Sequence, residues 1–276
     1  MEDTTVSNHL KAFSADFEAK YLELEKLGQG GFGSVYAGHR RSDDLPVAIK
    51  HIPNSDVRRQ KVKLNGRSRW IPKEVLLMQK AAGKPVTVGR SAAVSLLDWY
   101  DLDQEVILVM ERPVPSMELL RFMKEHRGPM AEDVAKIIME QLVDGAIDFQ
   151  AKGVFHRDIK AENILIEFSS YGLRVRFIDF GCGCIKKKNC VFNQYFGTVA
   201  YAPPEFQMNG QYMAGPTTVW QLASLLFEML DGFRQFHTTW FRRHELQISS
   251  VWSKADFEAK YLEHFGSVSA SHRRWR

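Results

Sequence analysis

The fold is decided by two short stretches, HRDIKAEN at residues 156–163 and DFG at residues 179–181. Short aliphatic runs at residues 164–168 and 174–178 flank a turn at residues 171–172, and they predict a β-hairpin between the two stretches. Chance does not account for several polar residue types that recur at this spacing. The two polar stretches and the hairpin between them are therefore the strongest indication of the fold in this sequence.

The polar residues of these stretches suit the transfer of a phosphoryl group. Asp158 is placed to accept or orient the proton of an attacking hydroxyl, and Lys160 to offset charge on the transferring group. Asn163 and Asp179 can hold magnesium. Each of these residues, taken alone, has a plainer interpretation as a polar loop residue.

A Gly-rich stretch, GQGGFGSV at residues 28–35, fits G-x-G-x-x-G-x-V between two predicted strands. Its glycines are Gly28, Gly30, Gly31 and Gly33. Positions without side chains let backbone N–H groups approach phosphate oxygens closely. A flexible hairpin and a dinucleotide-binding fold are the alternatives, but the second needs a helix directly after the glycines, where residues 34–37 predict a strand.

Lys50 ends the apolar run VAIK at residues 47–50, and it can reach phosphate groups only if a carboxylate holds it in place. Glu74 is the natural partner, because it lies in a predicted helix that begins at Pro72 and is stopped by Gly83. For either residue in isolation, a surface ion pair is the plainer explanation.

Hydrophobic patterning predicts an α+β fold of two lobes, one small and β-rich, the other rich in helix. Strands are predicted at residues 22–27, 34–39, 47–52, 94–100 and 105–111. Helices are predicted at residues 117–125 with Ser116 as cap, around residues 134–147, and at residues 219–230 behind Thr217 or Thr218. The predicted division is an extension at 1–23, a small lobe at 24–112, a partial helical lobe at 113–235 and an atypical tail at 236–276.

Composition restricts the partners. The formal net charge of +4 is spread along the chain and is too small to indicate a nucleic-acid groove. The first residues lack the apolar core of a signal peptide, and no stretch approaches the roughly twenty apolar residues that span a bilayer. We expect a monomer without nucleic-acid or membrane partners, located in the cytoplasm or the nucleus.

From about residue 24 to residue 232 the chain resembles the eukaryotic protein kinase superfamily, and Lys160 resembles the serine/threonine branch. The hinge ERPVP at residues 111–115 and YAPPE at residues 201–205 look like the Pim family. The resemblance implies a two-lobe kinase-like fold, ATP and Mg²⁺ as cofactors, and proteins with Ser or Thr acceptors as substrates. The ATP site that it implies, beyond the glycines and Lys50, comprises Leu27, Val35, Ala48, Met110, Glu111, Leu165 and Ile178.

The same resemblance implies a substrate-docking side formed by Glu118, Glu162 and Thr198, the last supporting the catalytic aspartate. Residues 182–196 contain no serine or threonine, and Tyr195 is the one hydroxyl there that could be phosphorylated. A switch by phosphorylation of this segment is therefore not expected.

Residues 255–263 repeat residues 15–23 letter for letter, and they follow a helical lobe that looks truncated. In the family Glu205 pairs with an arginine from the late helices, so we expect it to lack a partner here, and we expect exposed apolar surface on residues 219–230. Three readings follow: an active Pim-like kinase, a nucleotide-binding pseudokinase or decoy, and a truncated inactive fragment.

Overall fold

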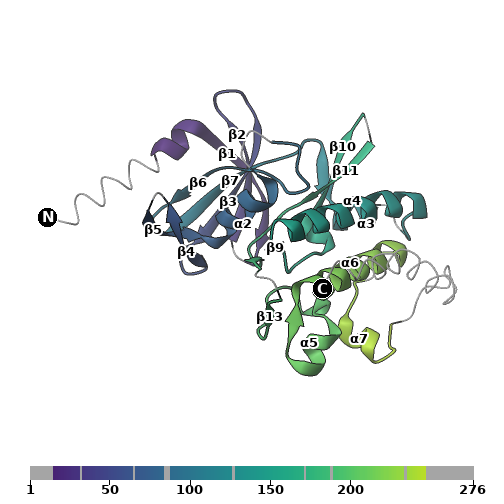
Figure 1. Ribbon diagram of the computed structural model, residues 1–276. Helices are drawn as coiled ribbons and strands as arrows, with labels where there is room; N and C mark the ends of the chain where they lie inside the picture. Colours follow the sequence, from purple (N-terminus) through teal and green to yellow (C-terminus); the bar gives the residue numbers. More distant parts are fainter. Residues whose placement is uncertain are drawn as a thin grey trace.

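The computed structural model describes residues 15–31, 33–64, 66–83, 88–125, 128–170, 172–186, 189–232 and 235–246. The five-stranded sheet lies in one lobe and most of the helices in the other (Figure 1), which confirms the predicted α+β, two-lobe fold class. The repeat at residues 255–263 lies outside the described residues.

The small lobe is built on an antiparallel sheet with the strand order β1-β2-β3-β7-β6. Its strands are β1 (Tyr21–Gly30), β2 (Gly33–Arg40), β3 (Pro46–Pro53), β6 (Leu96–Asp101) and β7 (Glu105–Glu111). All five predicted strands are present, because each contains an aliphatic run long enough to cross the sheet. Helix α2 (Lys73–Ala82) follows Pro72 and ends at Gly83, as predicted, and buries Val75, Leu77 and Met78.

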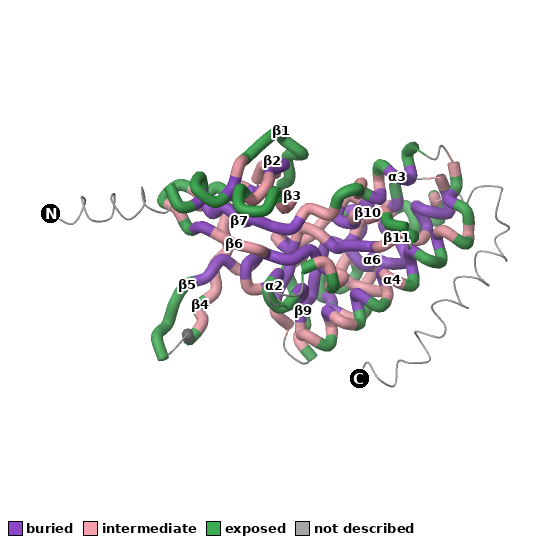
Figure 2. The backbone as a smooth tube through the Cα atoms, turned by 90° about the horizontal axis from the view of Figure 1, so that it is seen from above, coloured by how far each residue is buried: buried purple, intermediate pink, exposed green. Residues whose placement is uncertain are grey.

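A second hairpin, β4 (Arg59–Leu64) with β5 (Arg67–Pro72), projects from the small lobe (Figure 2) and was not predicted. Its sequence is mostly basic and polar, so it carries little of the hydrophobic alternation from which strands are predicted. Trp70 on β5 is 62% exposed, which shows that the hairpin does not contribute its large aromatic residue to the core.

The large lobe contains the remaining elements. They are β8 (Ser116–Glu118), α3 (Leu119–Glu125), α4 (Glu132–Ala151), β9 (Val154–Phe155), η2 (Ala161–Asn163), β10 (Ile164–Ser169), β11 (Gly172–Phe177), β12 (Cys184–Ile185), β13 (Val191–Phe192), η3 (Val199–Tyr201), α5 (Pro204–Asn209), β14 (Tyr212–Met213), α6 (Ala214–Leu230) and α7 (Thr238–Arg242). The predicted hairpin between the two motifs is β10–β11. Helix α4 contains the predicted residues 134–147.

Two helix starts were predicted wrongly. Helix α3 begins at Leu119, because residues 116–118 form β8 and pair with β10. Ser116 is no cap, since its hydroxyl donates to the Pro113 carbonyl oxygen at 2.7 Å. Helix α6 begins at Ala214, three residues before Thr217, and no side chain caps it. In both places tertiary contacts override the local cap signal.

The largest core cluster runs through both lobes, from α2 and β7 to α4 and α6, and buried stretches of backbone occur in both lobes in Figure 2. The expectation of exposed apolar surface on residues 219–230 is wrong. Phe236, which precedes α7, and Phe241, which lies on α7, pack edge-on against Trp220 with ring centroids 5.7 and 5.3 Å away. Phe236 also contacts Phe227. Residues 235–246 thus cover α6, while the predicted domain boundaries stay a prediction.

Candidate active site

The Asp158 carboxylate is held by donors from other parts of the chain. The Thr198 backbone N–H donates to Asp158 Oδ1 at 2.7 Å, and Asn163 Nδ2 donates to Asp158 Oδ2 at 3.1 Å. Asn163 Nδ2 also donates to the Asp158 carbonyl oxygen at 2.8 Å. Lys160 Nζ lies 3.7 Å from Asp158 Oδ2. Residues 156–163, called the catalytic loop below, therefore bring together the residues predicted from them. They fix a carboxylate that can still accept a hydrogen bond from a hydroxyl group.

Lys50 on β3 joins the small lobe to the DFG stretch. Its Nζ lies 2.8 Å from Glu74 Oε1 on α2 and 2.9 Å from Asp179 Oδ1. Burial by itself lowers the pKa of Lys50, but the two carboxylates outweigh burial and raise the pKa above its ordinary value. Lys50 is 4% exposed and Glu74 8% exposed, so the surface ion pair is excluded and the lysine is a fixed, buried positive charge.

Phe180 fixes the DFG stretch against the large lobe. Its buried ring lies 4.8 Å from the His156 ring and 5.6 Å from the Phe149 ring. His156 Nε2 lies 3.0 Å from the Ile178 carbonyl oxygen, and His156 Nδ1 accepts the Asp158 N–H at 3.3 Å. Burial lowers the pKa of His156, and a neutral ring with its proton on Nε2 satisfies both contacts. His156 thereby ties β11 and the DFG stretch to the backbone of Asp158.

Asn163 and Asp179 are the two residues predicted to hold a divalent cation. Asp158 engages the amide nitrogen of Asn163, so the amide oxygen is the atom left for a metal. Asp179 Oδ1 accepts from Lys50 and from the Gly181 N–H at 3.1 Å, which leaves Oδ2. Two oxygen ligands fit Mg²⁺, which takes water and phosphate oxygens at its other positions. Over the described ranges, no group of three or more His, Cys, Asp or Glu side chains could hold a metal.

The predicted phosphate-binding glycines have two different reasons to be glycine. An added Cβ at Gly28 or Gly31 would meet no atom within 4 Å, and at Gly30 it would meet only the Gly33 carbonyl oxygen at 3.7 Å. The backbone of this hairpin is therefore open to close approach by a phosphate. At Gly33, an added Cβ would lie 1.9 Å from the His51 carbonyl oxygen, so this glycine is required for packing β2 on β3.

The apolar residues of the predicted ATP site come from both lobes. Ala48 pairs with Met110 across β3 and β7, and the Ile178 N–H donates to the Asn163 carbonyl oxygen at 3.0 Å. Leu27 is 49% exposed. Those of intermediate burial are Val35, Ala48, Leu165 and Ile178. Incompletely buried apolar side chains on facing lobes are what an apolar ring system would cover.

Glu111 has a structural contact that the sequence did not predict. Its carboxylate pairs with the guanidinium of Arg176 and accepts the Gly89 N–H at 2.8 Å. Arg176 is 1% exposed, and burial lowers its pKa to about 10. This buried pair anchors β11 to the connection between the lobes. The predicted place of Glu111 in the ATP site stays a prediction.

The predicted docking residues lie on the large-lobe side of Asp158. Burial raises the pKa of Glu118, and the neighbouring Glu162 raises it further. Thr198 contacts Asp158 through its backbone N–H, so its side chain is not the supporting group. Sequence reasoning missed a third acid, Glu228 on α6, which accepts the Tyr201 hydroxyl at 2.7 Å and whose pKa burial raises to about 7.

Gln221 on α6 is the second residue that sequence reasoning missed. It is fully buried, its Nε2 donates to the Arg157 carbonyl oxygen at 2.6 Å, and its Oε1 accepts the Ile159 N–H at 3.2 Å. The two contacts lie on either side of Asp158. Gln221 therefore supports the catalytic loop, and its signal in the sequence was a glutamine between the apolar residues Trp220 and Leu222.

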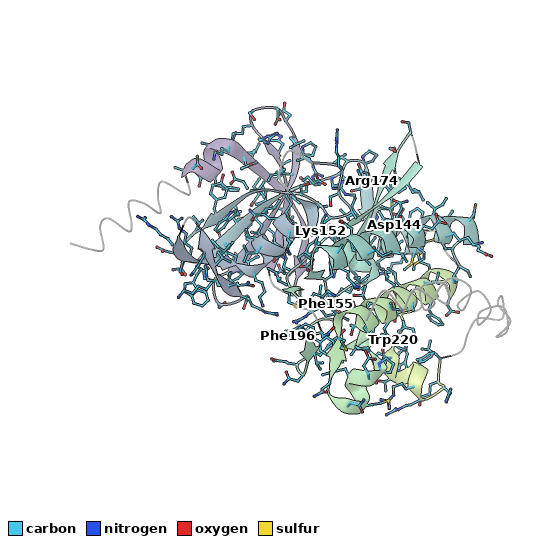
Figure 3. The ribbon with its side chains drawn as sticks, viewed as in Figure 1. Asp144, Lys152, Phe155, Arg174, Phe196 and Trp220 are labelled. Atoms are coloured by element: carbon cyan, nitrogen blue, oxygen red, sulfur yellow. The ribbon has the colours of Figure 1, made fainter. Side chains whose placement is uncertain are left out.

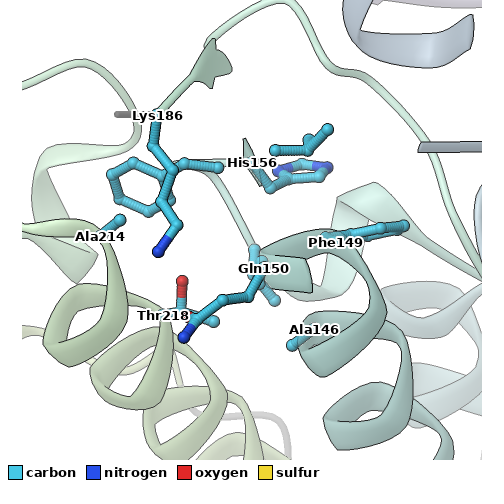
Figure 4. Close-up of a pocket in the computed structure, with 10 residues that line it drawn as sticks. Ala146, Phe149, Gln150, His156, Lys186, Ala214 and Thr218 are labelled. Carbon is cyan, nitrogen blue, oxygen red and sulfur yellow. The ribbon is translucent and has the colours of Figure 1, made fainter. Parts of the chain in front are cut away.

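A cavity of about 10 Å³ lies behind the catalytic loop, where β9 meets the ends of α4 and α6 (Figure 4). His156, Phe149, Gln150, Ala214 and Thr218 are among its lining residues. A volume of about one water molecule identifies it as a packing gap and not a ligand site.

In the part of the chain that the structure describes, no helix has the length and apolar character needed to cross a membrane.

Comparison with known proteins agrees with this geometry. The protein kinase domain family matches residues 21–270. Serine/threonine-protein kinase pim-2 from Danio rerio is 38% identical over 218 residues, 78% of this chain and 69% of that protein. Serine/threonine-protein kinase prk-2 from Caenorhabditis elegans is 32% identical over 216 residues, 78% of this chain and 46% of that protein. The chain belongs to the protein kinase family and, within it, is similar to the Pim kinases.

Proposed function

We propose that this protein is a serine/threonine protein kinase that transfers the γ-phosphoryl group of ATP to Ser or Thr hydroxyls of other proteins. The observation that carries the proposal is the assembled pair of networks, Lys50 with Glu74 and Asp179, and Asp158 with Asn163 and Thr198. Such networks are the parts that phosphoryl transfer requires in kinases. Residues 182–196 contain no serine or threonine, which supports activity that does not depend on phosphorylation of this segment.

The residues divide the chemistry between them. ATP with Mg²⁺ supplies the phosphoryl group and neutralises its charge when bound. Lys50 is oriented by Glu74 to hold phosphate oxygens, while Asn163 and Asp179 offer metal ligands. Asp158 orients the substrate hydroxyl and accepts its proton, and Lys160 lies close enough to offset charge on the transferring group.

The residue specificity is tested with Mg-ATP and a peptide library in which Ser, Thr or Tyr is the acceptor. We expect phosphoserine and phosphothreonine products, and we expect Lys160→Met to lower the rate by about a hundredfold or more, because a charge at the transferring group is lost. Phosphotyrosine as the sole product would contradict the proposal. Lys61→Met, on the exposed β4–β5 hairpin, is the matched control and should leave the rate unchanged.

A further inference from the structure

Arg157 contacts aromatic rings where a buried guanidinium would ordinarily need an acid. It is 5% exposed, and its guanidinium carbon lies 4.4 Å from the ring centroid of Phe192, 5.1 Å from Phe196 and 5.6 Å from Phe155. Among the described residues, no carboxylate forms an ion pair with it. All three distances lie within the roughly 6 Å over which cation–π attraction acts.

A second arginine contacts one of these rings from the small lobe. Arg58 immediately precedes β4, and its guanidinium carbon lies 4.5 Å from the Phe196 ring centroid. Phe155 and Phe196 lie where the small lobe meets the β13 side of the large lobe (Figure 3). The Phe196 ring is therefore held by two cations, one from each lobe.

The position of Phe196 matters because of the two residues that follow it. An added Cβ at Gly197 would lie 2.6 Å from the Arg157 carbonyl oxygen, so the chain passes directly against the catalytic loop. The next residue, Thr198, donates its N–H to Asp158 Oδ1 at 2.7 Å. The Phe196 side chain thus branches from the backbone two residues before this donor.

We propose that Phe196 is a positioning residue: Arg58 and Arg157 hold its ring by cation–π contact, and this contact fixes the Thr198 N–H on Asp158 without a phosphate group. The proposal rests on the proposed kinase function. Residues 182–196 contain no serine or threonine to phosphorylate. Their one phenol hydroxyl, on Tyr195, lies 3.3 Å from Gln221 Nε2 and 3.5 Å from the Thr198 carbonyl oxygen. The aromatic rings surround the Arg157 guanidinium, which is the kind of cation that a phosphate group binds.

A double-mutant cycle of Arg58→Met and Phe196→Leu tests the contact. We expect Phe196→Leu to lower kcat about tenfold and Arg58→Met about threefold, with KM for ATP unchanged, since Lys50 and the glycines are untouched. Arg58→Met in the Phe196→Leu background should cause no further loss, because the contact is already gone. Phe196→Trp should retain most of kcat, because an indole face attracts a guanidinium at least as well.

Arg59→Met is the matched control, because it removes the adjacent charge, whose partner is Asp101, 2.7 Å away. It should leave kcat unchanged. An activity-independent measurement is amide hydrogen exchange of the peptide that contains Gly197 and Thr198, which should be faster in Phe196→Leu and unchanged in Arg59→Met. Additive effects in the cycle, or wild-type kcat and exchange in Phe196→Leu, would overturn the proposal. If the wild type transfers no phosphate, the proposed function fails, and exchange alone decides the role of Phe196.

Discussion

Asp158 shows how few side chains set the chemistry of this molecule. Its two carboxylate oxygens receive one backbone N–H from Thr198 and one side-chain amide N–H from Asn163, which is itself buried. Lys50 is fixed in the same way between two carboxylates. A site held by partners in this manner loses little energy to reorganisation when charge moves during the reaction.

Glu205 is a half-buried acid in the opposite situation. Its Oε1 is buried and has no hydrogen-bond partner among the described residues, and burial raises its pKa, which agrees with the expectation of a missing arginine. We predict that Glu205→Gln leaves the free energy of unfolding at pH 7 unchanged or raises it by up to about 1 kcal/mol, because an unpaired charge is removed. Urea denaturation measures it.

Glu74→Gln is the contrasting variant. It should lower the free energy of unfolding by about 2 kcal/mol or more, since Lys50 loses a buried partner. A clear loss of stability in Glu205→Gln would mean that the Glu205 carboxylate does have a cation partner.

At the residue scale, sequence reasoning can name candidate residues where chemistry restricts both the residue type and the spacing. Asp158, Asn163 and Asp179 were identified for this reason, because no other residue types do the same work in phosphoryl transfer. Gln221 and Phe196 were missed because their roles depend on contacts with Arg157 and Arg58, far away along the chain. Nothing local in the sequence reports such a contact.

Helix α6 supports the site through a buried polar stripe. Its members are Thr217, Gln221, Ser224 and Glu228, spaced four, three and four residues apart, and each is at most 3% exposed. This spacing places them on one face of the helix. Gln221 contacts the catalytic loop, and Glu228 contacts Tyr201 and the Phe236 N–H. Helix α6 thus contacts both the catalytic loop and Tyr201 in η3.

Gln221→Glu tests the stripe at the catalytic loop. An ionised carboxylate would face the Arg157 carbonyl oxygen without a proton to donate, so we predict a kcat about a hundredfold below wild type at pH 8. Burial should raise the pKa of the new carboxyl, and its protonated form can donate to Arg157 while it accepts from Ile159. The ratio of variant to wild-type kcat should therefore rise as the pH is lowered to 6.

Gln221→Leu is the control, because it has no proton to gain and its kcat ratio should stay constant with pH. A constant ratio for Gln221→Glu as well would show that Gln221 does not act through these two hydrogen bonds.

Glu228 makes the stability of the α6 stripe depend on pH. Burial raises its pKa to about 7 in the folded protein, above its ordinary value of 4.5. The folded state therefore binds this proton more tightly than the unfolded state, and the stabilisation is lost as the pH rises through 7. We predict that the free energy of unfolding of Glu228→Gln, relative to wild type, increases by about 2 kcal/mol from pH 5 to pH 8. Denaturant titrations at several pH values measure this difference; a flat difference would contradict it.

At the element scale, long apolar runs were predicted correctly and short paired strands were not. Strand β8 has three residues and exists because β10 supplies its hydrogen-bond partners. The β4–β5 hairpin pairs Lys61 with Trp70 and Val62 with Arg69, so each of these cross-strand pairs joins a charged residue to an apolar one. Neither strand therefore shows a clear hydrophobic alternation. Both cases reflect pairing between strands, which overrides local propensity.

The whole molecule holds its two lobes through one continuous core and through ion pairs that cross between them. Lys50 and Asp179 come from different lobes, as do Arg176 and Glu111, and the Val94 N–H donates to the Phe177 carbonyl oxygen at 3.1 Å. Residues 235–246 cover α6 on the far side of the catalytic loop. The described residues therefore provide a supported site, which favours an active enzyme over a poorly folded fragment.

Nucleotide binding should stabilise the whole molecule. At a Mg-ATP concentration of about 100 times its Kd, we predict a rise in Tm of about 5–10 °C, because binding to the folded state alone adds about 2.7 kcal/mol. Thermal denaturation followed by circular dichroism measures it. Asp179→Asn should show a smaller rise, and so should the wild type with ATP and excess chelator. An equal rise with and without the metal would contradict the assignment of Asn163 and Asp179.

The central claim is that Asp158 serves phosphoryl transfer from ATP to a protein hydroxyl. The most direct measurement is phosphate incorporation, followed by mass spectrometry, with the full chain and its Asp158→Asn variant incubated with Mg-ATP and a Ser/Thr protein substrate. We predict incorporation with the wild type and a loss of at least about a thousandfold in rate with the variant. Equal incorporation by both proteins would contradict the account.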